Sequence, residues 1–347
     1  MDRSICALSL AFSLCVTSVA NSQGIADRVR LDRGTETGEI TDMSPLELTL
    51  SKARSGSSTV PVNEIKTVLF ADEPSELTQA RVNAANGSYE NALTALEKLD
   101  VASVKRDFIE QDIEFYKAFC AAKLALSGKR EIDEAGRQLN TFVRTYPQNF
   151  HYLATVELMG DLLMASGRYD HAERQYAELG KAPWPDYKMR AAVAVGRTLQ
   201  AQGKHAEAIA RFDAALTMVG DTADAQHQKL SATLGKAVSL AETGGVNEAV
   251  DMIERIIADA DPEQKELHAR AYNALGVCHE KAGQTKDALL AFLHVDVLYS
   301  TVPEAHAEAL AYLVPLWKAI GQEERSRQAR ELLRDRYAGS QWAKNLQ

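Results

Sequence analysis

The sequence has 347 residues, of which 46% are hydrophobic and 25% are charged, and its formal net charge is −9. These fractions are those of an ordinary soluble globular protein. The acidic balance argues against a nucleic-acid-binding surface as the main functional feature, so no nucleic acid is expected among the partners.

Residues 1–20 have the pattern of a secretory signal peptide. One basic residue, Arg3, precedes an apolar run that ends in the small residues Ser18 and Ala20, and this arrangement predicts cleavage after Ala20. The run is short for a membrane span, and no second apolar segment of spanning length follows, so no transmembrane span is expected in the mature chain. The sequence therefore predicts an exported protein, periplasmic or secreted.

Residues 24–72 predict a small β unit. Five short segments, ADRVRL, GEITDM, LELTLS, STVPVN and KTVLFA, alternate in polarity or are rich in β-branched residues, and turn-forming stretches separate them, which indicates about five strands. The spacing of Gly34 and Gly38 resembles that in five-stranded barrels of the SH3 or Sm type. Fewer than fifty residues bury little surface, so we expect this unit to dock on the first helices.

Residues 75–344 are punctuated by glycines at a regular interval. Successive glycines lie 36 to 41 residues apart, and periods of this size are typical of stacked repeat arrays. Glycine at the end of a helix adopts a left-handed backbone at little cost, so each one predicts the turn of a helix–turn–helix unit. The seven glycines are Gly87, Gly128, Gly167, Gly203, Gly244, Gly283 and Gly321.

Five of these units share a tighter pattern. An alanine follows the glycine by five residues, a small residue precedes that alanine by twelve, and a bulky apolar residue follows it by four. Small side chains at matching depth let two helices approach closely, and the bulky residue lies on the same helical face as the alanine. The alanines are Ala92, Ala172, Ala208, Ala249 and Ala288; the small residues are Ala80, Gly160, Gly196, Ala237 and Gly276; the bulky residues are Leu96, Tyr176, Phe212, Ile253 and Phe292.

This pattern resembles the tetratricopeptide repeat (TPR) family over residues 75–344. Prolines near the unit ends, Pro147, Pro185, Pro262 and Pro303, fit it, whereas the longer period and the missing early tryptophan depart from it. The resemblance implies a mostly α fold, a right-handed α-α superhelix of about seven helical pairs, with the small β unit at its N-terminus. The units at Gly128 and Gly321 are degenerate, and in the latter Ser326 replaces the alanine.

The sequence contains none of the common catalytic motifs. H-E-x-x-H, paired C-x-x-C, G-x-S-x-G and the P-loop are missing from it. Cys278 beside His279 is the nearest approach to a metal pair, but adjacent helical side chains point about 100° apart. Cys120 and Cys278, the cysteines that remain after signal-peptide removal, lie four repeats apart and are expected to be buried free thiols. The sequence therefore predicts no catalytic, cofactor-binding or metal site, and a protein that is not an enzyme.

The remaining candidate for a functional surface is the concave wall of the predicted superhelix. In the TPR family the first helix of each pair lines a groove, and the resemblance carries its polar positions over to six residues of this chain. An alternative interpretation is that Glu157 or Asp161 pairs with Arg190 or Arg197 on the next helix, as an exposed ion pair worth about 0 to 1 kcal/mol. The candidate groove residues are Glu157 and Asp161, Arg190 and Arg197, and Arg270 and Asn273.

The function predicted from these observations is a non-enzymatic protein–protein interaction scaffold of the cell envelope. Its concave face would bind an extended peptide or a helix of a protein partner. The sequence identifies neither this partner nor the oligomeric state. In that case charge at Arg190 and Arg197 controls binding, and reversing both charges is expected to leave stability nearly unchanged. The alternative is that the β unit binds the ligand or partner and the helical array is a spacer.

Overall fold

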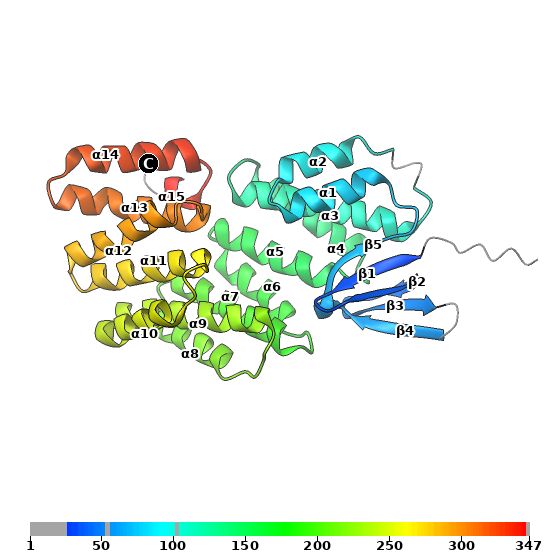
Figure 1. Cartoon of the computed structure of the whole chain (residues 1–347), viewed down its shortest axis with the longest axis horizontal. Coiled ribbons are helices and arrows are strands. Elements are labelled where there is room, and N and C mark those ends of the chain that lie inside the picture. Colours follow the sequence, from blue (N-terminus) through cyan, green and yellow to red (C-terminus); the bar gives the residue numbers. More distant parts are fainter. Residues whose placement is uncertain (1–25, 53–55, 101–103, 345–347) are drawn as a thin grey trace, which may run out of the picture.

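The structure is a computed structural model of the chain, and it describes residues 26–52, 56–100 and 104–344. Within these residues the chain forms a five-stranded sheet followed by fifteen helices (Figure 1). None of the described helices is both long and apolar enough to cross a membrane. The predicted signal peptide lies outside the described residues.

The N-terminal unit contains the five predicted strands. All neighbours are antiparallel, in the order β4-β3-β2-β1-β5. Alternate residues point inward, so that Val29, Ile40, Leu48 and Val68 are buried. The strands are β1 (Asp27–Leu31), β2 (Thr35–Met43), β3 (Glu47–Lys52), β4 (Gly56–Pro61) and β5 (Ile65–Leu69), with the short 3-10 helix η1 (Val62–Glu64) before β5.

The helices form seven antiparallel pairs and one short terminal helix. Each of the seven predicted glycines lies in the turn of one pair, with φ between 71° and 98°, where glycine is favoured over other residues. The predicted repeat is therefore confirmed. The pairs are α1 (Ser75–Ala85) with α2 (Tyr89–Glu97), α3 (Asp107–Leu126) with α4 (Ile132–Thr145), α5 (Tyr152–Ala165) with α6 (Tyr169–Leu179), α7 (Pro185–Ala201) with α8 (His205–Leu216), α9 (Ala223–Glu242) with α10 (Val246–Asp259), α11 (Lys265–Lys281) with α12 (Thr285–Leu298) and α13 (Pro303–Ala319) with α14 (Glu323–Tyr337), and α15 (Gln341–Lys344) follows.

The small and bulky positions of the repeat meet inside each pair. A Cβ added at Gly196 would lie 2.6 Å from the ring of Phe212, and one added at Gly160 would lie 2.5 Å from the ring of Tyr176. The ring of Phe212 also abuts Gly235 on the first helix of the next pair, where a Cβ would lie 2.4 Å away. One aromatic ring thus closes its own pair and joins it to the next.

The β unit docks on the first helices, as expected. Val29 of the sheet shares one hydrophobic core with Ile113 of α3 and with Phe150, which precedes α5. Asp27 binds Arg106 through two hydrogen bonds of 2.6 and 2.9 Å and accepts others from the backbone of Ile40 and Ala71. Burial alone would raise the pKa of Asp27, but these hydrogen bonds lower it below its ordinary value.

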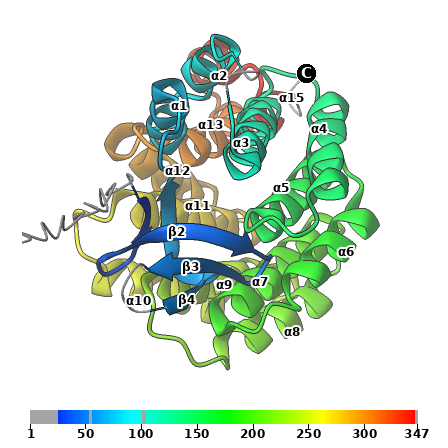
Figure 2. The same cartoon turned by 90° about the vertical axis from the view of Figure 1, so that its right-hand side faces the viewer.

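The seven pairs make one turn of a superhelix. Viewed along its axis, the first helices line the inside and the second helices the outside, while β2, β3 and β4 lie across one end (Figure 2). The last pair returns beside the first pairs, displaced along the axis (Figure 1). Cys120 and Cys278 are buried free thiols, and burial raises the pKa of each to about 12.

Candidate functional site

The six predicted groove residues lie on the first helices α5, α7 and α11, and the polar residues of these helices and of α13 are called the inner wall below. The charge of Arg197 on α7 lowers the pKa of Glu308 on α13, three pairs further along the chain. Charges interact appreciably only over short distances, so these two side chains lie near each other. The six residues nevertheless do not form one set, because the structure uses them in different ways.

Arg190 is a structural link between three successive pairs. Its guanidinium donates a 3.0 Å hydrogen bond to Glu157 on α5 and a 2.8 Å hydrogen bond to Asp224 on α9, and it lies over the ring of Tyr187 at 4.9 Å. The ion-pair interpretation therefore holds for Glu157 and Arg190. Burial raises the pKa of Glu157 even beside this arginine, and the nearby Asp161 adds to the rise.

Asp161 and Arg197 do not form the alternative ion pair. The Tyr176 hydroxyl donates a 2.8 Å hydrogen bond to Asp161, so this carboxylate is held by an aromatic residue of its own pair. Arg197 is exposed, and within the described part of the chain no carboxylate lies within ion-pair distance of its guanidinium. Arg197 is thus a charged donor on the wall whose hydrogen-bonding capacity is free for a ligand.

Asn273 and Arg270 are likewise used within the protein. Asn273 is 2% exposed, and its amide donates to the backbone oxygen of Ala305 at 2.8 Å and to Glu308 at 2.9 Å. It ties α11 to α13 and is not accessible to a partner. Arg270 is half-exposed and pairs at 2.9 Å with Glu266, one turn away on the same helix.

Glu308 is the wall residue that the sequence analysis missed. It lies eighteen positions before Ser326, as Arg190 lies before Ala208 and Arg270 before Ala288, so counting back from the degenerate copy would have found it. Glu308 keeps some exposed surface, yet the surrounding protein desolvates it and raises its pKa to about 7. The hydrogen bond from Asn273 and the positive charges of Arg197 and Arg270 offset part of that rise.

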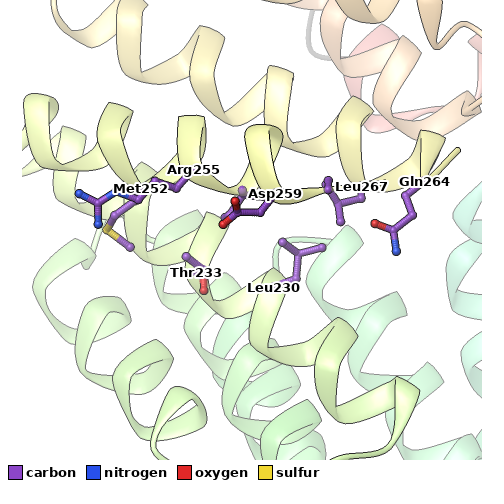
Figure 3. A pocket seen from close by; sticks show the side chains of 9 residues that line it. Leu230, Thr233, Met252, Arg255, Asp259, Gln264 and Leu267 are labelled. Carbon is purple, nitrogen blue, oxygen red and sulfur yellow. The ribbon is translucent and has the colours of Figure 1, made fainter. Parts of the chain in front are cut away.

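A separate groove of about 460 Å³ lies between α9, α10 and α11 (Figure 3). Leu230, Met252 and Leu267 supply apolar surface, and Arg255 and Asp259 supply opposite charges. These two charged residues are exposed. Among the described residues, no group of three His, Cys, Asp or Glu side chains is placed to hold a metal ion.

Comparisons with known proteins bear on the helical part of the chain. A tetratricopeptide repeat family model matches residues 157–226 and 234–300. No curated protein matches the sequence.

Solved structures of low sequence identity share the fold. A tetratricopeptide repeat protein from Parabacteroides merdae has a TM-score of 0.56 at 15% identity, with 78% of this chain and 96% of that chain covered. Rap protein complexed with competence and sporulation factor has a TM-score of 0.54 at 11% identity, with 78% of each chain covered. NprR in complex with its cognate peptide NprX has a TM-score of 0.50 at 14% identity, with 78% of this chain and 80% of that chain covered. The matched segments, the seven glycine turns and these likenesses agree that the helical part of the chain has a TPR-like fold, preceded by a five-stranded sheet.

Proposed function

We propose that this protein is a non-enzymatic binding scaffold whose inner wall holds an extended segment of a protein partner. The observation that supports this most directly is Arg197, an exposed guanidinium on the wall with no described carboxylate within ion-pair distance, whereas Arg190 and Arg270 are paired. A guanidinium binds a carboxylate with two parallel hydrogen bonds. We therefore infer that the partner segment presents an acidic side chain or a terminal carboxylate to Arg197.

The form of the wall favours an extended chain over a helix. Arg197 on α7 lowers the pKa of Glu308 on α13, so charged groups from two helices of the wall lie near each other. A helix with its side chains is about 10–12 Å across, whereas an extended chain is slimmer and offers backbone groups along its whole length. Two of the solved structures with this fold, Rap and NprR, are described as complexes with a factor or peptide, which agrees with the proposal.

The β unit is the less favoured binding element. Its inward side chains belong to one core with α1 and α3, so the helical array completes the sheet and does not act as a separate spacer. Deleting the unit would expose Leu77 and Ile113, which are both 0% exposed. A deletion would therefore confound loss of binding with loss of fold, and surface substitutions are the better test.

The proposal can be tested with a displayed library of random peptides, selected on the immobilised chain. We expect the selected peptides to carry a carboxylate and to lose at least tenfold in affinity on Arg197→Glu, because a like charge placed opposite an anion costs several kcal/mol. The matched control is Arg211→Glu, which reverses an exposed arginine on α8 and should leave the affinity unchanged. Equal binding by the chain with Arg197→Glu would contradict the inner wall as the site.

We further propose the cell envelope as the place of action. The support is the sequence of residues 1–20, with Arg3 before an apolar run that ends at Ala20. N-terminal sequencing of the protein from its host should find a first residue at or near Asn21. An intact Met1 on protein recovered from the cytoplasm would overturn this part of the proposal.

A further inference from the structure

The second and the last helical pairs touch each other at one place, called the seam below. Ser127 and Gly128, in the turn between α3 and α4, lie against Gly339, in the turn between α14 and α15. A Cβ added at Gly339 would lie 2.0 Å from the backbone oxygen of Ser127, and one added at Gly128 would lie 2.0 Å from Cα of Gly339. Only two glycines allow the backbones to approach this closely.

A second observation places the same two ends together. The charge of Glu304, at the start of α13, helps to raise the pKa of Tyr89, at the start of α2. In Figure 1, α13 and α14 follow α1, α2 and α3 along the superhelix axis, so that the two groups face each other end to end. The superhelix therefore meets itself after one turn, at the ends of these helices.

The seam differs from every link between successive pairs in what holds it. Arg190 joins α7 to both neighbouring pairs, Asn273 joins α11 to α13, and Gln200 donates a 2.8 Å hydrogen bond to Gly235 of the next pair. Within the described residues, by contrast, no hydrogen bond or ion pair joins residues 124–132 to residues 333–344. Opening the seam breaks no hydrogen bond or ion pair between these residues, whereas opening any of these links breaks at least one.

We propose that the seam is the gate of the inner wall, through which a partner segment enters sideways when the superhelix widens and behind which it is enclosed when the glycines meet again. The sheet strands lie across one end of the superhelix (Figure 2), and the seam is the contact around its circumference that no hydrogen bond or ion pair between described residues holds. This inference rests on the proposed function, because it assigns an entry route to the same site.

Access to the wall can be measured without a partner. A thiol introduced by Arg197→Cys reports from the wall, and one introduced by Arg211→Cys reports from the exposed outer helix α8. The native Cys120 and Cys278 are buried with pKa values of about 12, so they react slowly with either reagent. The readout is the ratio of the labelling rate with a polyethylene-glycol maleimide to that with iodoacetamide, since only the first reagent is large.

Gly339→Ala should open the gate, and Gly136→Ala is the control variant that should not affect it. Neither glycine has a positive φ, so alanine fits both backbones, but Gly136 has open space around its Cβ position. We expect the rate ratio at Arg197→Cys to be at least tenfold below that at Arg211→Cys, and Gly339→Ala to raise it at least tenfold. Gly136→Ala should leave it unchanged. Equal ratios at the two thiols in the unmodified background, or no effect of Gly339→Ala in a chain with native circular dichroism, would overturn the gate.

A cross-link separates the gate from the proposed function. Ser127→Cys and Ala338→Cys place exposed thiols on either side of the seam, and a short bismaleimide should join them. Peptides selected on the wall should then associate at least tenfold more slowly with the cross-linked chain than with the same variant before cross-linking. An unchanged association rate overturns the gate while the binding site stands. If no peptide is selected at all, the proposed function fails, and the labelling ratios alone decide whether the seam controls access.

Discussion

Replacing Gly196 by alanine tests the packing rule that builds the array. The new Cβ would lie 2.6 Å from Cε1 of Phe212, whose ring is fully buried and also abuts Gly235 of the next pair, so the ring has no free direction in which to move. Alanine gains about 1 kcal/mol of helix propensity over glycine, while overpacking a filled core costs about 1 to 3 kcal/mol. The free energy of unfolding should therefore fall by about 0 to 2 kcal/mol.

The matched control for this prediction is Gly136→Ala in α4. No atom lies within 4 Å of the Cβ position at Gly136, so this variant should gain about 1 kcal/mol of stability. Urea titrations followed by far-ultraviolet circular dichroism should separate the two variants by about 1 to 3 kcal/mol at unchanged slope. If both alanines raise the midpoint equally, the contact between the small residue and the ring does not limit how closely the helices approach.

Two further predictions concern charges on the inner wall. Because the pKa of Glu308 is raised to about 7, the folded state binds the proton of this carboxyl more tightly than the unfolded state does. The wild type should therefore lose about 1 to 3 kcal/mol of stability relative to Glu308→Gln as the pH rises from about 4.5 to 8, after discounting for partial exposure. Equal pH profiles of the two chains in urea titrations would show that Glu308 is solvated like an ordinary carboxylate. Arg190→Glu should lower the free energy of unfolding by about 1 to 3 kcal/mol, because it removes two ion pairs and places a like charge beside their carboxylates. Arg197→Glu should change the free energy of unfolding by no more than about 0.5 kcal/mol. A thermal melt that ranks the two variants in the opposite order would contradict the assigned contacts.

The second charge prediction corrects an expectation from the sequence. Reversing Arg190 and Arg197 together was expected to leave stability nearly unchanged, because both positions were assigned to an open groove. The structure shows that Arg190 bridges Glu157 and Asp224 on its two neighbouring pairs. The sequence spacing places both arginines on one side of α7, but it does not say which of them meets a carboxylate.

Local pattern predicted the repeat because each unit uses the same contacts. The turn glycines, and the pairing of Gly160 with Tyr176 and of Gly196 with Phe212, depend only on residues within about one unit, so a single sequence contains the information. The five strands were likewise predicted from alternation. Asn273 lies on the first helix of its pair, but its burial against Ala305 depends on how closely the next pair packs.

The seam could not have been predicted in the same way. Whether Gly128 meets Gly339 depends on the small rotation between pairs, summed over the whole turn of the superhelix. An error of a few degrees at each step would open the turn or make it overlap. Glu308 was missed for a simpler reason, since the degenerate unit with Ser326 was not used to count back to the wall.

The bond between Asp27 and Arg106 has a consequence for the order in which the protein is completed. The two residues are 79 positions apart, and the sheet containing Asp27 ends at Leu69. While the chain is being made, all five strands are therefore available before the guanidinium that neutralises their buried carboxylate exists. A buried carboxylate without its partner is strongly unfavourable, so the sheet cannot reach its final state until the start of α3 has been synthesised. The sheet is thus completed only once the chain has reached Arg106, so its final packing depends on the residue that precedes α3.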